Sequence, residues 1–216
     1  MVDETRDTYT LHKPLRFKFQ RRKTLSYGIG DLIQSDLVDM SKFSRQNKGI
    51  KFLLTSIDVF SKKAYVQALK NKSANAVLEA FKKLLKQIGP IKHLQTDQGR
   101  EFYNKKLQKL FTKNKINYYS SHSEYKASVV ERFNHTLKNK LFRIFTHRGS
   151  YKYIDILTKV LKSYNDSIHR STFAPNQVTS KLEPTIFRKL YGYKRNLNYK
   201  FDIGEQVRIS KSRKNF

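Results

Sequence analysis

The sequence has no cysteine, no long apolar run and few acidic residues. Without cysteine, the chain can form neither a disulfide nor a cysteine-bearing zinc site, which is compatible with a reducing compartment. No apolar stretch approaches the roughly 20 residues that a membrane helix needs. The polar N-terminus, acidic near its start, does not resemble a secretory signal. We therefore expect a soluble intracellular protein.

The few acids stand against a large excess of bases. There are 17 Asp and Glu residues and 45 Lys and Arg residues, which give a formal net charge of +28. Because self-repulsion of this size opposes a compact fold, a polyanionic partner is the natural explanation. Nucleic acid is the leading candidate, and the alternative is a basic protein whose charge serves solubility or acidic protein partners.

Hydrophobic periodicity indicates one main α/β domain, because three adjacent strands are followed by alternating helices and strands. Strands are predicted over 32–38, 52–59, 64–69, 91–96 and 116–120, with a polar, basic hairpin around 46–49 between the first two. Helices are predicted over 73–89, 104–114, 127–146 and 151–168. A polar loop at 121–126 precedes the third helix. Hydrophobic residues make up 38% of the chain, which is enough for a core.

Four segments follow from this pattern. Residues 1–29 form a basic N-terminal arm, which could grip phosphates, act as a nuclear address or simply be a loosely ordered terminus. The main domain spans 30–170, and 171–200 form a linker with a short helix after Leu182. Residues 201–216 are expected to be the truncated start of a small C-terminal β domain, since one strand cannot bury its own face. An ordinary terminal extension packed on the main domain is the alternative.

Three carboxylates occupy positions that suit phosphate chemistry. Asp36 lies inside the first apolar strand, where an acid is costly unless it is compensated. Asp97 ends the fourth strand, where binding crevices open in α/β sheets, and Gly99 allows close backbone approach. Glu131 falls in the first turn of the third helix. Each alone has an ordinary explanation: an ion pair, a turn and a solvated helix face. Their ordered combination favours a shared site.

The helix that carries Glu131 has a polar stripe of its own. His135 and Lys138 lie within about 40° of Glu131 on a helical wheel, apart from the apolar stripe. A carboxylate followed by two cationic side chains suits a metal ligand flanked by phosphate contacts. Two divalent cations can clamp the attacking and leaving oxygens of a phosphodiester, and Mg²⁺ prefers hard oxygen ligands.

Three blocks of the sequence resemble the signature blocks of retroviral-type (DDE) integrase catalytic cores: Ile33 to Asp36, Thr96 to Phe102 and Ala127 to Asn134. Two further stretches, Asp36 to Met40 and Ile57 to Lys62, make the likeness greatest to integrases of Maverick/Polinton DNA transposons and related transposon-derived proteins. The resemblance implies a ribonuclease-H-like mixed five-stranded sheet flanked by helices, followed by the start of an SH3-like domain. It also implies two Mg²⁺ or Mn²⁺ ions held by the catalytic triad Asp36, Asp97 and Glu131.

The resemblance further implies trimming of DNA ends by water, then attack of the new 3′-hydroxyl on target DNA by a homo-oligomer in the nucleus. Residues expected to contact DNA are Lys138, His135, Asn134, Lys126 and Arg132. Asp58 and Glu101 are expected to be structural, and Asp39 to point elsewhere on its strand. Two departures are Ile33, where Trp is usual, and the absence of a His/Cys zinc module. Two alternatives remain: a domesticated or decayed relative that binds nucleic acid without catalysis, and a simple nuclease.

Overall fold

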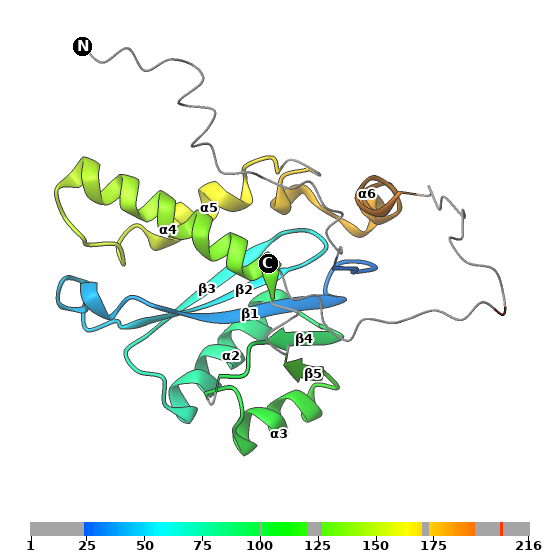
Figure 1. Ribbon diagram of the computed structural model, residues 1–216, viewed down its shortest axis with the longest axis horizontal. Helices are drawn as coiled ribbons and strands as arrows, with labels where there is room; N and C mark the ends of the chain where they lie inside the picture. Colours follow the sequence, from blue (N-terminus) through cyan, green and yellow to red (C-terminus); the bar gives the residue numbers. More distant parts are fainter. Residues whose placement is uncertain (1–23, 100, 121–126, 170–172, 193–203, 205–216) are drawn as a thin grey trace, which may run out of the picture.

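The computed structural model describes residues 24–99, 101–120, 127–169, 173–192 and 204. Its centre is a sheet of five strands in the order β3-β2-β1-β4-β5 (Figure 1). The strands are β1 (Leu32–Asp39), β2 (Phe52–Asp58), β3 (Ala64–Leu69), β4 (His93–Thr96) and β5 (Asn117–Ser120). Strands β1 to β3 pair antiparallel, whereas β4 runs parallel to β1 and β5 parallel to β4. The predicted mixed five-stranded sheet is confirmed.

Helices cover both faces of this sheet (Figure 1). One face carries α4 (Ser128–Arg148) and α5 (Leu157–Asn165), and the other carries α2 (Ala74–Ile88) and α3 (Lys105–Lys113). Three short 3-10 helices, η1 (Ser41–Asn47), η2 (Pro175–Gln177) and η3 (Ser180–Leu182), and α6 (Glu183–Tyr191) complete the described elements. Helix α6 is the short helix predicted after Leu182. The strand predicted near the C-terminus lies outside the described residues, apart from Gly204.

Strand alternation divides the core into two layers, because successive side chains of a strand point to opposite faces. In β2, Leu53 and Ile57 pack under α4 and α5, while Leu54 packs against the layer of α2. In β1, Val38 faces α4 and Ile33 faces α2. Asp36, two positions before Val38, therefore faces α4.

The ends of α2 follow the local sequence. The Ser73 hydroxyl accepts a hydrogen bond from Ala76 N at 3.4 Å, as a helix N-cap does. At the other end Gly89 has a φ of +87°, which favours glycine and stops the helix. Both predicted ends are confirmed.

Two local predictions are wrong. The connection between β1 and β2 is not a plain turn around 46–49, because it contains the 3-10 helix η1. The helix predicted over 151–168 begins only at Leu157 and ends at Asn165, and Ile168, expected on its apolar stripe, is 79% exposed. The next paragraph gives the reason for the late start.

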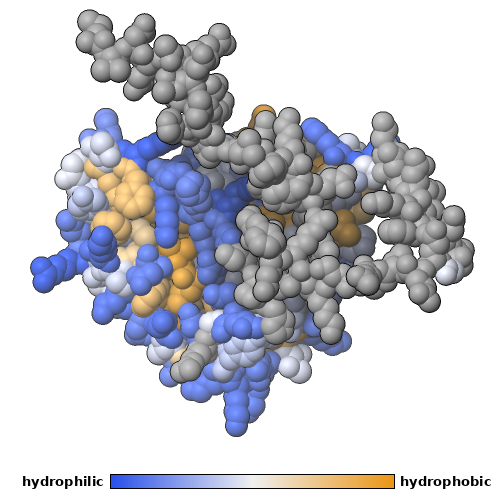
Figure 2. All heavy atoms as spheres, in the orientation of Figure 1, coloured by the Kyte–Doolittle hydropathy of each residue, from blue (hydrophilic) through white to orange (hydrophobic). Residues whose placement is uncertain are grey.

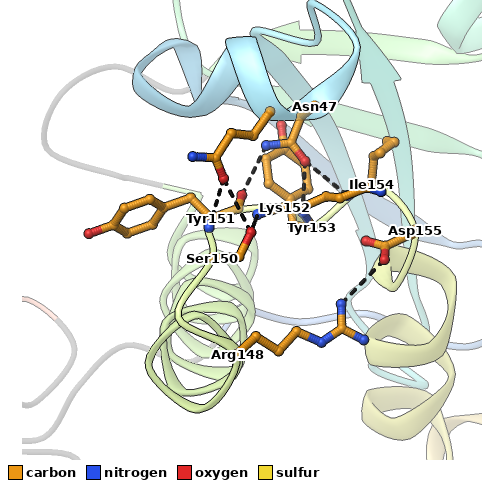
Figure 3. A network of polar contacts seen from close by, with 9 residues as sticks. Asn47, Arg148, Ser150, Tyr151, Lys152, Tyr153, Ile154 and Asp155 are labelled. Atoms are coloured by element: carbon orange, nitrogen blue, oxygen red, sulfur yellow. Dashed lines mark hydrogen bonds and ion pairs between the residues drawn. The ribbon is translucent and has the colours of Figure 1, made fainter.

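Buried Asn47 at the end of η1 holds the connection between α4 and α5 (Figure 3). Its Oδ1 accepts hydrogen bonds from Tyr153 N at 2.7 Å and Ile154 N at 3.1 Å, and its Nδ2 donates to Tyr151 O at 3.0 Å and Phe43 O at 2.7 Å. We call these five residues the Asn47 clamp. Because a remote side chain takes these backbone groups, the chain turns into α5 only after them.

Helix α6 packs on the segment just before β1. The Tyr191 hydroxyl accepts from Ser26 N at 3.0 Å and donates to Thr24 O at 3.2 Å. The Glu183 carboxylate accepts from Ile29 N at 2.9 Å, and the rings of Tyr27 and Phe187 stack with centroids 5.8 Å apart. Two segments more than 150 residues apart in the sequence thus form one packed unit.

Hydrophilic residues cover most of the described surface in Figure 2, and hydrophobic residues reach it in a limited band. No helix in the described part of the chain has the length and apolar character to cross a bilayer.

Candidate active site

Asp36 and Asp97 lie side by side on neighbouring strands. In the parallel β1–β4 pair, Gln34 is opposite Gln95, so Asp36 falls opposite Asp97, the first residue after β4. Glu131 stands in the first turn of α4, which packs over β1. Two strand residues and one helix residue, up to 95 positions apart, thus converge on one region.

Asp36 lies close enough to Asp97 and to Glu131 for the charge of each to raise its pKa. Burial raises this pKa above the usual value of 3.8, and the charges of Asp97 and Glu131 raise it further. Hydrogen bonds from Leu37 N and Asn134 act in the opposite direction. The electrostatic contact of Asp36 with both other acids agrees with the sequence prediction, and their sharing of one metal site stays a prediction.

A hollow of about 330 Å³ opens between β1 and α4. It is lined by Asp36, Leu37, Val38, Asp39, Glu131, Asn134, His135 and Lys138. The polar stripe of Glu131, His135 and Lys138 thus faces this hollow. Asp39, predicted to point elsewhere, lines it too; its carboxylate accepts from Ser41 N at 2.7 Å.

Asn134 orients the Asp36 carboxylate. Its Nδ2 donates to Asp36 Oδ2 at 2.7 Å, while Leu37 N donates to Asp36 Oδ1 at 2.7 Å. Asn134 is only 7% exposed, and its Oδ1 is buried without a hydrogen-bond partner. Buried acceptors are nearly always satisfied, so this unpartnered oxygen beside Asp36 is unusual.

The turn after β4 exposes Asp97. Its Oδ1 accepts from Gly99 N at 3.1 Å. A Cβ on Gly99 would lie 3.1 Å from the same oxygen and 2.9 Å from Glu101 Cδ, so the turn has little room for a larger residue. The ordinary turn and the candidate site therefore coexist here, and Gly99 lets the backbone come close to the carboxylate.

These donors fit a hard divalent cation. Three carboxylates and the free Asn134 oxygen are oxygen ligands of the kind that Mg²⁺ and Mn²⁺ prefer, and mutual repulsion favours a bound cation. Within the described ranges, no three His, Asp or Glu side chains gather as a compact group that could hold one ion. These residues therefore suit a divalent cation by the type and charge of their ligand oxygens.

The remaining residues predicted to contact DNA are spread over different places. His135 and Lys138 line the hollow, with His135 Nε2 3.0 Å from Asn139 Nδ2. Arg132 is not among the lining residues; burial lowers the pKa of Lys62 and the charge of Arg132 lowers it further, so Arg132 lies toward the turn between β2 and β3. Lys126 is outside the described residues.

The sequence analysis missed two residues behind the site. Gln34 contacts the start of α4, and Gln95 contacts Gln34. The signal that could have revealed them is the start of α4, where Ala127 stands at the N-cap position and makes no side-chain cap.

Comparisons with known proteins show which family and fold the chain resembles. Residues 28–124 match the family model described as the integrase core domain. A transposon-derived protein of Caenorhabditis elegans is 34% identical over 179 residues, 82% of this chain and 61% of that protein. The Gag-Pol polyprotein of gibbon ape leukemia virus is 29% identical over 156 residues, 69% of this chain and 9% of the polyprotein. The chain thus spans about three fifths of the first relative and a small part of the second.

Solved integrase structures share the fold. The HTLV-2 integrase catalytic core domain, solved with magnesium, has a TM-score of 0.60 and 21% identity, over 71% of this chain and 99% of that one. An integrase chain of the simian T-cell lymphotropic virus intasome has a TM-score of 0.65 and 16% identity, over 92% of this chain and 66% of that one. These likenesses confirm the predicted ribonuclease-H-like fold. Residues 28–124 thus match the integrase core domain, and the chain shares the fold of solved retroviral integrase cores.

Proposed function

We propose that this protein is a metal-dependent DNA integrase in which Asp36, Asp97 and Glu131 form the catalytic triad. The observation that carries the proposal is the electrostatic coupling of Asp36 to the other two carboxylates beside a polar hollow. Two bound Mg²⁺ or Mn²⁺ ions would supply the positive charge that stabilises the attacking and leaving oxygens. The three carboxylates would hold these ions.

Two balanced phosphoryl transfers follow from this assignment. In the first, a water oxygen bonds to phosphorus near a DNA end, the P–O3′ bond breaks, and the leaving oxygen gains a proton as a new 3′-hydroxyl. In the second, this 3′-hydroxyl loses its proton and bonds to a target phosphorus, and the target's own 3′-oxygen leaves. The partners are therefore DNA ends and target DNA.

Residues around the triad have separate tasks in this proposal. Asn134 keeps the Asp36 carboxylate turned toward the hollow through its 2.7 Å hydrogen bond. His135 and Lys138, on the same stripe as Glu131, contact DNA phosphates, and Asn134 contacts the DNA near them. Arg132 and Lys126 contact DNA beside them. We further propose that the protein works as a homo-oligomer on DNA in the nucleus.

The alternative is a transposon-derived protein that binds nucleic acid without catalysis. The absence of a compact three-residue metal group from the described part of the chain favours it. The net charge of +28 supports nucleic-acid binding under both proposals.

A strand-transfer assay with Asp97→Asn separates the two. The substrates are duplex oligonucleotides with randomised ends and a plasmid target, with Mn²⁺ or Mg²⁺. We expect the variant to lose at least about 100-fold in joining rate, because even outer-shell partners of a metal are worth 10–100-fold. Its salt-dependent DNA binding should be retained.

Glu79→Gln is the matched control, since Glu79 is an exposed acid on α2. It should join DNA as fast as the wild type. Equal joining by Asp97→Asn and the wild type would exclude the triad. A folded wild type that binds DNA but neither cuts nor joins it would favour the alternative, and cutting without joining would indicate a nuclease.

A further inference from the structure

We infer that Gln34, with Gln95 as its partner, is a positioning residue that sets the spacing of the three carboxylates for divalent-cation binding. The inference rests on the proposed function, because it concerns the same site. It concerns two neutral side chains that touch none of the carboxylates.

Gln34 joins three elements through one buried amide. Its Oε1 accepts hydrogen bonds from Val129 N at 3.0 Å and Val130 N at 3.1 Å, in the first turn of α4. Its Nε2 donates to Gln95 Oε1 on β4 at 2.8 Å. Gln34 is 0% exposed and Gln95 8% exposed. The side chain of Gln34 thus ties β1 to β4 and to the start of α4.

Helix α4 depends on this contact because its own sequence does not cap it. The first four N–H groups of a helix have no partner inside the helix. Ala127 offers no side-chain cap. Because Val130 is fully buried, water does not satisfy its N–H group in place of a cap. Gln34 satisfies two of these donors from a strand 95 residues earlier. Without it the first turn, which holds Glu131, would be free to loosen.

Three of the residues joined by this contact each stand two positions before a carboxylate in the sequence. Gln34 is two positions before Asp36, Gln95 two before Asp97 and Val129 two before Glu131. The amides are buried, whereas Asp36 is half-buried and the other two acids are exposed. Asp36, Asp97 and Glu131 stand on β1, directly after β4 and in the first turn of α4, which are the three elements that the Gln34 amide joins. A neutral amide restrains them without adding charge to the site, and supporting groups of this kind hold ligands in binding geometry.

The test compares Gln34→Met with Ser35→Ala in the full chain. Methionine keeps the length of the glutamine side chain but neither donates nor caps. Ser35 is equally buried in β1, and its hydroxyl is 2.6 Å from that of Ser56, away from α4. Gln34→Met loses three buried hydrogen bonds and Ser35→Ala loses one, so both should melt several degrees below the wild type without metal.

Metal affinity distinguishes the two roles, because a residue that only stabilises the fold would leave this affinity unchanged. Mn²⁺ affinity, measured by electron paramagnetic resonance, should weaken roughly 10-fold in Gln34→Met and stay unchanged in Ser35→Ala. The Mn²⁺ concentration for half-maximal joining should rise by the same factor. Gln95→Met keeps the cap of α4 and should therefore weaken Mn²⁺ binding less than Gln34→Met does. If Gln34→Met does not fold, the Mn²⁺ affinity of Gln95→Met tests the positioning role.

The outcomes separate this inference from the proposed function. Wild-type Mn²⁺ affinity in both Gln34→Met and Gln95→Met would overturn the positioning role while the wild type still joins DNA. An equal loss in Ser35→Ala would also overturn it, since any buried defect would then have the same effect. A wild type that binds no Mn²⁺ and joins no DNA would overturn the proposed function itself.

Discussion

The two ends of α4 are both held by a buried amide from another element, but only one end lies beside acids. At the start, Gln34 accepts from Val129 N and Val130 N. Beyond the end, Asn47 accepts from Tyr153 N and Ile154 N. The first contact lies next to the triad, whereas the second lies among aromatic rings. A buried amide thus holds backbone groups beside each end of α4, and only the amide at the start is proposed to act on the carboxylates.

The ends also differ in what the local sequence provides. Gly149 closes α4 in the left-handed region, with a φ of +60° and its N–H bonded to Phe145 O. The start has Ala127 and no local cap. Helix α4 can thus end without help, and Asn47 fixes only the path of the chain that follows. At the start, the remote amide is part of the helix itself.

The largest effect expected at the far end comes from Asn47→Leu. Leucine fills the space but leaves four backbone groups of the clamp without partners. We expect a loss of about 3 kcal/mol or more, which corresponds to roughly 6–12 °C in melting temperature. Thermal unfolding measures it. Mn²⁺ affinity of the folded fraction should not change; a loss like that of Gln34→Met would mean that both ends act as one unit.

A second prediction concerns stabilisation by Mg²⁺, which should act at the start of α4 alone. At 100 times the dissociation constant, binding adds about 2.7 kcal/mol, or roughly 5–10 °C. Thermal unfolding with and without Mg²⁺ should show this gain in the wild type and in Asn47→Leu. Asp97→Asn should lose most of it. An unchanged wild-type melting temperature would argue against the metal site.

The smallest effect is a pH dependence at Asp58, the last residue of β2, which pairs with Ile33 of β1. Burial raises the pKa of Asp58, despite hydrogen bonds from Ser61 Oγ at 2.7 Å and Phe60 N at 3.0 Å. A carboxyl group whose pKa is raised by folding stabilises the folded state fully at pH values below its unfolded pKa. This stability is lost as the pH rises through the folded pKa.

The melting temperature of Asp58→Asn relative to that of the wild type should therefore rise by about 2–4 °C between about pH 4 and about pH 7. The difference between Asn47→Leu and the wild type should stay constant over this range, because the clamp contains only uncharged hydrogen-bonding groups. A parallel pH trend in both variants would contradict the assignment to Asp58.

The sequence predicted most of the fold because periodicity and turn residues are local signals. Ser73 and Gly89 mark both ends of α2, and the position of Asp97 after an apolar strand located the carboxyl end of β4. The three acids of the proposed triad were selected because they stand in short blocks whose order resembles one family. The expected placement of Glu131, His135 and Lys138 on one stripe needed only the helical repeat.

The missed features all depend on contacts far apart in the sequence. The start of α5 is decided by Asn47, more than 100 residues earlier, which competes for the backbone groups that a helix would use. The role of Gln34 depends on Val129 and Val130, 95 and 96 positions later. No periodicity records such pairs. Asn134 was assigned to DNA from its position near Glu131, and its bond to Asp36 became visible only in the fold.

The packing of α6 on the segment before β1 determines where the chain can be shortened without losing contacts. Tyr191 and Glu183 hold backbone groups of Ser26, Thr24 and Ile29. A fragment ending at residue 170 would remove these partners and uncover Tyr27, which stacks on Phe187. A recombinant piece from Thr24 to Gly192 therefore retains these contacts between α6 and the segment before β1, and trimming it further from either side should increase its susceptibility to proteases.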